Sequence, residues 1–368
     1  MVRILADMAI RVVHIGTGNV GRLALAELIA NPAFELAGLC VSAAEKVGRD
    51  AGELAGLDIV TGVVATDDLA AVLATEPQCA VYCAMGDTRL VEAMSDVQQI
   101  LAAGVNVVGS APGVLQFPWK VIPDKFVEAV EEAGRQGGSS IFINGVDPGF
   151  VTDLIPLAFA GTCRGVEQVR CMEIADYATY DGAVVMFDVM GFGKPFDEVP
   201  LLFQPGVLRV AWGCAIRQLA AGLNIVIDEI TESYEREPAP QAFDIAAGHV
   251  PKGTVAAVRF EIIGMSGGTP VIVVEHVTRL RGDLRPDWAQ PAQPGGSYRV
   301  EITGEPSYVV DICPTSEFGD HNHAAISAAA GRIVNAIPAV VAAPPGIRTT
   351  LDLPLVSSVN LFAGSRLG

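Results

Sequence analysis

Apolar and polar positions in the first 150 residues alternate between strand-like runs and helix-like spacing. Short apolar runs predict strands at residues 10–15, 34–41, 59–64, 80–83 and 106–109. Between them, residues 21–30 and 89–103 have helical spacing. This regular exchange of strand and helix predicts a parallel sheet with helices on both faces, in a first domain that covers residues 1–150.

The regular exchange ends after Phe150, where strand-like segments follow one another without helical crossovers. These segments lie at residues 166–174, 255–263, 271–280, 298–303 and 307–312. The strict alternation of residues 298–303 is typical of a sheet with one solvated face. Residues 207–223 carry the apolar stripe of a helix. We therefore expect residues 151–320 to form a second α/β domain with a mostly antiparallel sheet. Residues 321–368 are expected to form a C-terminal helix and tail that pack back on the first domain.

A segment rich in Gly, Pro, Met and Phe, residues 181–206, has no clear periodicity. We expect a long loop there, and loops of this length often close over a ligand. Its residues Met186 and Phe192 are expected to line an apolar cavity. The alternative is that they belong to the core of the domain.

Composition narrows the class of protein. The chain has 368 residues, of which 51% are hydrophobic, and a formal net charge of −18. The apolar fraction excludes a disordered chain, and the negative charge argues against nucleic acid or anionic lipid as a partner. The most apolar stretch, residues 324–347, is interrupted by Arg332 and by prolines, so we expect no membrane span. Seven cysteines without framework spacing fit a reducing, cytoplasmic environment.

The strongest motif is the glycine-rich turn after the first strand, Gly16-Thr17-Gly18-Asn19-Val20-Gly21. It opens a helix within a strand–helix–strand unit, the context in which such a turn binds the pyrophosphate of a dinucleotide. Gly16 makes the tight turn, Gly18 lets the pyrophosphate approach the backbone, and Gly21 packs the helix against the strand. We therefore expect a Rossmann domain; the alternative is a fold that has lost its cofactor.

The end of the second strand bears on which nicotinamide dinucleotide is bound. NAD enzymes usually place an acidic residue there for the ribose hydroxyls, whereas this chain has Ser42 followed by Lys46. A small hydroxyl with a cation nearby suits a 2′-phosphate, so we expect NADP(H), with NAD(H) as the alternative because Glu45 lies beside them. The loops after the next two strands are expected to flank the ribose and nicotinamide through Ala84, Met85, Gly86, Ser110 and Ala111.

Several motifs carry a family resemblance. Residues 10–21 and 48–56 resemble the N-terminal domain of dihydrodipicolinate reductase. Residues 145–150, 190–195 and 334–346 are similar to the native amine dehydrogenases and 2,4-diaminopentanoate dehydrogenase, a resemblance that covers most of the chain. It implies a homodimer with an N-terminal Rossmann domain, for which the apolar sheet of the second domain would offer an interface. It also implies NAD(P)H-dependent reductive amination of a ketone or aldehyde by ammonia, and the reverse reaction.

One departure from that family concerns its catalytic carboxylate. The resemblance implies a Glu shortly after the strand at 106–109, but Pro112 and Gly113 stand in that region here. The following Phe117-Pro118-Trp119 is similar to the family pattern. An iminium cation without a nearby anion would be a costly buried charge. Either another acid substitutes, or the reaction differs.

Candidates for the substitute acid lie around the start of the second domain. Asp147 is in the Gly-Val-Asp-Pro-Gly loop, where a turn role before Pro is the alternative. Asp176 and Tyr177 follow the first strand of the second domain, where a carboxyl or phenol of shifted pKa could exchange protons; an ordinary strand-end loop is the alternative. Glu173 precedes them. We expect the substrate to contact Phe150, Phe117, Met186 and Phe192.

The histidines give weaker signals. His14 lies in the first buried strand and is expected to be structural, while His276 is expected on the wet face of an alternating strand. His321 and His323 form a His-x-His pair without a partner cluster, so we expect no metal site.

Three functions remain open. The leading hypothesis is a cytoplasmic, NADP(H)-dependent oxidoreductase of the amine dehydrogenase type that acts on a small to medium, largely apolar carbonyl with ammonia, or on the corresponding amine. A carbonyl or cyclic-imine reductase without ammonia is the second, favoured by the missing Glu. A cofactor-binding sensor without turnover is the third.

Overall fold

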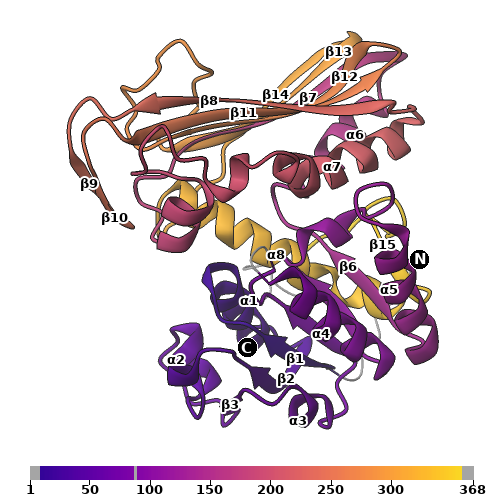
Figure 1. Ribbon diagram of the computed structural model, residues 1–368. Helices are drawn as coiled ribbons and strands as arrows, with labels where there is room; N and C mark the ends of the chain where they lie inside the picture. The colour runs from indigo at the N-terminus through magenta and orange to yellow at the C-terminus, as the bar shows by residue number, and fades with distance from the viewer. Residues whose placement is uncertain (1–8, 87–88, 359–368) are drawn as a thin grey trace. The chain divides into compact units, whose positions relative to one another are not determined.

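The computed structural model describes residues 9–86 and 89–358, which divide into two compact units (Figure 1). Unit 1 combines the chain up to Val146 with the segment from Ile326 onward. Unit 2 is the continuous stretch Asp147–Ala325. Each unit has hydrophobic clusters of its own.

Unit 1 contains a seven-stranded parallel sheet with the strand order β15-β6-β5-β4-β1-β2-β3. The strands are β1 Ile10–Ile15, β2 Phe34–Cys40, β3 Ala65–Thr66, β4 Cys79–Tyr82, β5 Asn106–Gly109, β6 Ser140–Ile143 and β15 Gly346–Arg348. The order reverses between β1 and β4, which is where open α/β sheets bind their ligands. The predicted parallel Rossmann sheet is confirmed.

Strand β3 begins later than its apolar run indicated. Residues 59–64 form a loop in which Thr61 and Gly62 donate backbone hydrogen bonds to the Asp50 carboxylate at 3.0 and 2.8 Å. Val60 is 89% exposed. The Asp50 side chain thus organises this loop and leaves only Ala65–Thr66 to pair with β2.

Helices cover the sheet of unit 1. They are α1 Asn19–Ala30, α2 Ala51–Ala55, α3 Leu69–Leu73, α4 Leu90–Ala102, α5 Asp124–Gly137 and the long α8 His321–Val341, with short 3-10 turns η1 Ala44–Lys46 and η2 Gly113–Gln116. By length and composition alone α8 could cross a membrane. However, Ile333, Ile337 and Val340 are fully buried in one cluster with Val12 of β1 and Phe142 of β6. This burial is typical of a core helix.

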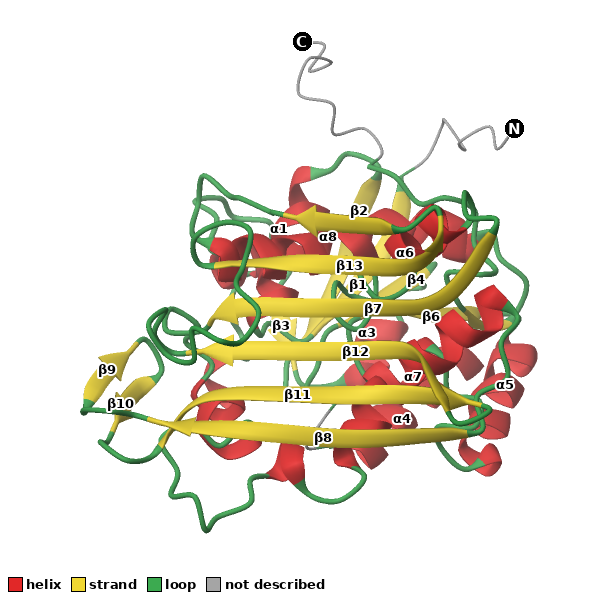
Figure 2. Ribbon diagram, turned by 90° about the horizontal axis from the view of Figure 1, so that it is seen from above, coloured by secondary structure: helices red, strands yellow, loops and turns green. Residues whose placement is uncertain are grey.

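Unit 2 is built on a six-stranded sheet with the order β14-β13-β7-β12-β11-β8 (Figure 2). The strands are β7 Gly165–Asp176, β8 Glu229–Pro238, β11 Val255–Ser266, β12 Thr269–Arg279, β13 Gly296–Glu305 and β14 Tyr308–Ile312. The β7–β12 pair is parallel and the other pairs are antiparallel, which confirms the mostly antiparallel sheet. A separate small ribbon pairs β9 Phe243–Ile245 with β10 Gly248–Val250.

Two helices, α6 Leu154–Ala160 and α7 Val207–Leu223, pack on one face of this sheet. We call it the inner face and the opposite one the outer face, onto which Figure 2 looks. The segment 181–206 is not a plain loop: it holds a π-helical turn, η3 Val184–Val189, and a 3-10 turn, η4 Leu201–Phe203. Met186 and Phe192 are fully buried in the core of unit 2, because this segment's apolar side chains complete that core.

Candidate active site

The glycine-rich turn joins β1 to α1 at the reversal of strand order. Gly16 has φ +89°, and a Cβ there would lie 2.6 Å from the backbone nitrogen of Ala84. A Cβ on Gly21 would lie 2.1 Å from the carbonyl oxygen of Gly16. Gly18, in contrast, has no described atom within 4 Å of its Cβ position. The turn is therefore closed on the protein side and open at Gly18, as the approach of a pyrophosphate requires.

His14 stabilises the glycine-rich turn through a hydrogen bond to the backbone of Gly16. It is fully buried on β1, and its Nε2 donates to the carbonyl oxygen of Gly16 at 2.7 Å. Burial lowers the pKa of His14 to about 4, so the imidazole is neutral at physiological pH. The structural role expected for this residue is confirmed.

The other expected cofactor residues lie at the carboxyl ends of neighbouring strands. Lys46 follows β2 in η1, and its Nζ donates to the carbonyl and hydroxyl oxygens of Thr17, both at 3.0 Å. Ser42 is exposed at the end of β2. Residues 84–86 follow β4 and residues 110–111 follow β5. Asn19 and Val20 open α1, whose first amides carry the positive end of the helix dipole. These residues fit a dinucleotide phosphate group.

The strand register of unit 2 places polar side chains from separate strands in one row on the inner face. His276 of β12 lies opposite Glu173 of β7, and Glu173 lies opposite Tyr298 of β13. Asp147, the first residue of unit 2, and Tyr177, just after β7, complete the group. We call these five residues the Glu173 cluster. His276 and Glu173 are buried, with 4% and 6% of their surfaces exposed.

Aromatic side chains fix the position of Asp147 and His276. Trp212 of α7 donates from Nε1 to Asp147 Oδ1 at 3.0 Å. The His276 ring stacks on Phe260 of β11 with centroids 4.6 Å apart, and Trp212 meets it edge-on at 4.7 Å. His276 Nε2 then lies 3.1 Å from Asp147 Oδ2. Neither of these two buried atoms has a hydrogen-bond partner of suitable geometry among the described residues.

Burial and neighbouring charges shift the pKa values of Glu173 and His276 within the cluster. Burial raises the pKa of the Glu173 carboxyl; His276 and the hydrogen bond from Tyr177 act against this, and Asp147 adds to it. Burial opposes the charged form of His276, but the Asp147 carboxylate outweighs it and raises the pKa of the imidazole. Oxygen and nitrogen atoms of Asp147, Glu173 and His276 lie within 4.8 Å of one another, a set that could hold a cation or pass a proton.

The structure brings two of the three predicted catalytic residues together. Asp147 and Tyr177 meet at Glu173, whereas Asp176 lies outside the cluster and accepts a hydrogen bond from the amide of Ala178 at 2.9 Å. The expectation that His276 faces water is wrong, because its strand is buried on both faces. Sequence reasoning missed Tyr298, which joins the cluster only through strand pairing.

The expected substrate residues are dispersed. Phe117, in unit 1, packs edge-on against Trp119 with centroids 5.0 Å apart. Phe150 is partly buried near the start of unit 2. The burial of Met186 and Phe192 favours the alternative weighed for them, the domain core.

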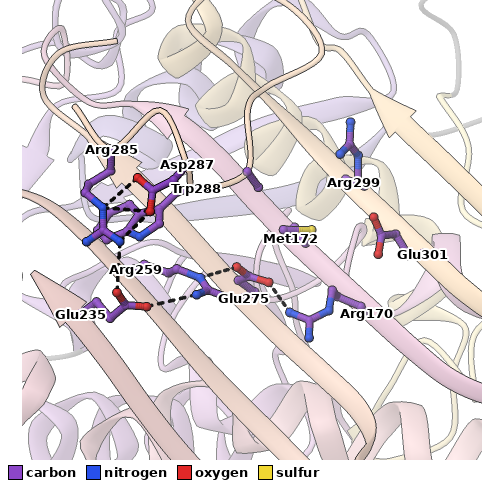
Figure 3. A pocket seen from close by; sticks show the side chains of 11 residues that line it. Arg170, Met172, Glu235, Arg259, Glu275, Arg285, Asp287, Trp288, Arg299 and Glu301 are labelled. Atoms are coloured by element: carbon purple, nitrogen blue, oxygen red, sulfur yellow. Dashed lines mark hydrogen bonds and ion pairs between the residues drawn. The ribbon is translucent and has the colours of Figure 1, made fainter. Parts of the chain in front are cut away.

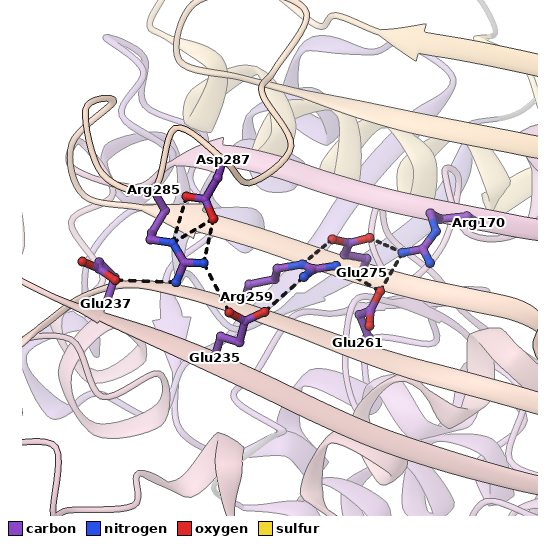
Figure 4. A network of polar contacts seen from close by, with 8 residues as sticks. All are labelled: Arg170, Glu235, Glu237, Arg259, Glu261, Glu275, Arg285 and Asp287. Atoms are coloured by element: carbon purple, nitrogen blue, oxygen red, sulfur yellow. Dashed lines mark hydrogen bonds and ion pairs between the residues drawn. The ribbon is translucent and has the colours of Figure 1, made fainter.

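The outer face of the unit 2 sheet carries charged groups rather than the apolar surface expected there. Arg285, Glu235, Arg259, Glu275 and Arg170 form a chain of ion pairs (Figure 4). They border an open cavity of about 410 Å³ (Figure 3). Since successive side chains of a strand point to opposite faces, Glu275 lies on the outer face and its neighbour His276 on the inner face.

Comparisons with known proteins agree with one another. The family model of the 2,4-diaminopentanoate dehydrogenase C-terminal domain matches residues 150–363. An amine dehydrogenase from Streptomyces virginiae is 40% identical over 347 residues, which are 94% of this chain and 96% of that protein. A 2,4-diaminopentanoate dehydrogenase from Acetoanaerobium sticklandii is 24% identical over 295 residues, 77% of this chain and 76% of the relative.

The fold also matches solved structures. An amine dehydrogenase from Mycobacterium smegmatis has a TM-score of 0.79 at 21% identity, covering 98% of this chain and 100% of the other. At this identity the likeness concerns the fold alone, a Rossmann domain followed by a second domain with its own sheet.

Proposed function

This chain belongs to the 2,4-diaminopentanoate dehydrogenase family and is an oxidoreductase of the amine dehydrogenase type, and we propose that it catalyses the NADP(H)-dependent reductive amination of a ketone or aldehyde by ammonia, and the reverse reaction. The observation that carries the proposal is the 40% identity to an amine dehydrogenase over nearly the whole chain. The glycine-rich turn and the buried Glu173 cluster supply sites for a dinucleotide and for proton exchange.

The cofactor, when bound, supplies or accepts the hydride. Gly18 and the first amides of α1 would hold its pyrophosphate. Lys46 is held against Thr17 by two hydrogen bonds, so a cation stands beside the adenosine end of the turn. Ser42 at the end of β2 leaves room for a 2′-phosphate, which an acidic residue would repel.

A comparison of NADPH with NADH tests the proposed preference for NADP(H). We expect kcat/KM for NADPH to exceed that for NADH by at least about tenfold. Ser42→Asp should reverse the preference, because the carboxylate repels a 2′-phosphate and accepts hydrogen bonds from ribose hydroxyls. Ser42→Ala serves as the control for loss of the hydroxyl alone. Equal losses for both cofactors in Ser42→Asp would contradict the assignment.

A second candidate function is carbonyl or cyclic-imine reduction without ammonia. It is favoured by Pro112 and Gly113, which stand in η2 and its cap where the family resemblance implies a carboxylate. The same hydride donor would serve both reactions, so only the role of ammonia separates them.

The deciding experiment is oxidation of NADPH with a panel of ketones and aldehydes at alkaline pH, with and without ammonium. Turnover that depends on ammonium supports the proposed function. Equal turnover without ammonium identifies a carbonyl reductase, and turnover of preformed cyclic imines identifies an imine reductase. Tight NADPH binding without turnover on any of these substrates would indicate a cofactor-binding sensor.

We further propose a cytoplasmic homodimer that associates through the outer face of unit 2. Arg and Glu side chains line an open cavity on this face, and a two-fold interface pairs one surface patch with the same patch of a second copy. Val309 on the same face is 68% exposed. The seven cysteines are free thiols, as a reducing compartment requires.

Light scattering on a sizing column tests the dimer. Val309→Glu, which places a carboxylate opposite Glu301, should shift a 10 µM sample toward the monomer mass, on the order of a tenfold weaker association. Val91→Glu on the exposed side of α4 in unit 1 is the control. A parent protein that elutes as a monomer would refute the proposal.

A further inference from the structure

Glu173 lies at the centre of the inner-face row, between the imidazole of His276 and the phenols of Tyr177 and Tyr298. We propose that Glu173 is the acid–base residue of the amine dehydrogenase reaction and that Asp147 and His276 form a positioning pair that sets its protonation. The inference rests on the proposed function. It assigns to Glu173 the role of the carboxylate that the family resemblance implies in the region where this chain has Pro112 and Gly113.

The first argument is that the cluster is preorganised. Three neighbouring strands present Glu173, His276 and Tyr298 side by side, and strand register holds them more firmly than a loop would. The Tyr177 hydroxyl donates a hydrogen bond to Glu173 Oε1, which fixes the position of one carboxyl oxygen. Asp147 and His276 are held in turn by Trp212 and Phe260.

The second argument is that Asp147 and His276 form a buried ion pair whose hydrogen bonding is incomplete. Asp147 Oδ2 and His276 Nε2 belong to side chains that are 1% and 5% exposed, and the two atoms lie 3.1 Å apart as an ion pair without hydrogen-bond geometry. Neither atom has a hydrogen bond to another group within the described part of the chain. A buried polar atom that forms no hydrogen bond destabilises the folded state. Such a cost is common at sites that gain a ligand or a proton during the reaction.

The third argument is charge. The cluster combines two carboxyl groups with a single imidazole, a set that offers an ammonium or iminium cation one more acidic than basic group. The guanidinium groups of β7 and β13 are paired elsewhere, Arg170 with Glu275 and Arg299 with Asp311. Arg279 of β12 donates its hydrogen bonds to backbone carbonyl oxygens of residues 284, 285 and 289.

One carboxyl group, that of Glu173, can both accept and return the proton that the reaction requires. Ionised Glu173 takes a proton from ammonium, and the ammonia released forms a C–N bond with the carbonyl carbon as the C=O π bond breaks. A proton then passes from the new C–NH3⁺ group to the alkoxide oxygen, which gives the neutral carbinolamine. Protonated Glu173 then gives this proton to the carbinolamine hydroxyl, the C–O bond breaks, and water leaves with that electron pair. The nitrogen lone pair forms the iminium, whose charge faces the Glu173 carboxylate. When bound, NADPH would supply the hydride that reduces the iminium carbon, so that carbonyl, ammonium and NADPH together would give a neutral amine, NADP⁺ and water.

Other titratable groups near Glu173 also influence its protonation. The cluster itself contributes Asp147, Tyr177, His276 and Tyr298, while Cys171, Cys214, Tyr180 and Glu275 interact with its members. Of these, Asp147 is the carboxylate in contact with the His276 imidazole.

The test compares Glu173→Gln with Glu167→Gln, an exposed glutamate on the same strand. We expect Glu173→Gln to lower kcat of ammonium-dependent turnover by about 10²–10⁴-fold, as for loss of a general acid–base group. NADPH affinity, measured by fluorescence, should stay within twofold, and Glu167→Gln should behave as the parent. Circular dichroism and NADPH binding check folding, and Glu173→Asp, which keeps the carboxyl, should recover part of the activity.

The positioning role of Asp147 and His276 is tested by the dependence of kcat on pH. In Asp147→Asn the His276 imidazole loses the carboxylate that favours its charged form, so the acidic limb of the kcat–pH profile should move by about one unit or more. A structural role alone would lower activity without moving the profile.

The outcomes separate the two proposals. Parent enzyme without ammonium-dependent turnover refutes the proposed function and this inference with it. An active parent whose Glu173→Gln variant keeps kcat within threefold refutes the inference alone. Loss of activity on EDTA dialysis, restored by a divalent metal, would also overturn it in favour of a metal held by Asp147, Glu173 and His276.

Discussion

Glu27 of α1 is a carboxylic acid held inside unit 1. Its Oε2 is buried and has no partner among the described residues, and Gly331 of α8 faces it, where a Cβ would lie 3.6 Å from Oε1. Burial raises the pKa of Glu27 from 4.5 to about 7. The folded state therefore binds this proton more tightly than the unfolded state, so the contribution of Glu27 to stability is fully present below pH 4.5 and is lost as the pH rises through 7.

Glu27→Gln should remove this pH-dependent penalty. The neutral amide carries no charge to bury, so the free energy of unfolding at pH 8 should increase by about 2 kcal/mol, less than the full shift implies because the group is only partly buried. At pH 4.5 parent and variant should be nearly equal. Urea unfolding at both pH values measures the difference, with exposed Glu92→Gln on α4 as the control. A variant that is less stable at pH 8 would show that Glu27 has an ionic partner.

At the scale of single elements, the turn between β1 and α1 contains two glycines with different requirements. Gly16→Ala places a Cβ 2.6 Å from the Ala84 nitrogen at a positive φ, so it should destabilise the fold by about 1–3 kcal/mol as well as weaken NADPH binding. Gly18→Ala has room in the protein and should leave the melting temperature unchanged. Its methyl group would occupy the approach of the pyrophosphate, which should raise the Kd for NADPH by about 10–100-fold. An unchanged Kd in Gly18→Ala would place the pyrophosphate elsewhere.

The sequence was sufficient where a feature depends on neighbouring residues, and insufficient where it depends on strand register. The Gly16 turn follows its own strand and opens its own helix, so its geometry is local. Glu173 and His276, in contrast, are about a hundred residues apart and meet only because β12 pairs in parallel with β7. Periodicity could not place His276 because β12 is buried on both faces and lacks the alternation that marks a wet side. The segment 181–206 shows the same limit: its glycines and prolines predict a loop, and outside its two short helical turns it is irregular, but the core position of its apolar side chains depends on the folded unit.

At the scale of the whole molecule, unit 1 depends on a helix that the chain supplies almost 200 residues after β6. Ile337 of α8 is fully buried against the sheet of this unit, and the clusters of unit 2 do not include it. Ile337→Ala should therefore destabilise unit 1 by about 2–5 kcal/mol and leave unit 2 nearly unchanged. Bound NADPH should raise the same transition that Ile337→Ala lowers, because ligand binding stabilises the unit that holds the site. Calorimetry, with Trp119 fluorescence reporting on unit 1 and Trp212 and Trp288 on unit 2, would separate the transitions. Exposed Val91→Ala is the control. If Ile337→Ala moved both reporters equally, the two units would unfold as one, and the division of the core between them would not describe the stability of the protein.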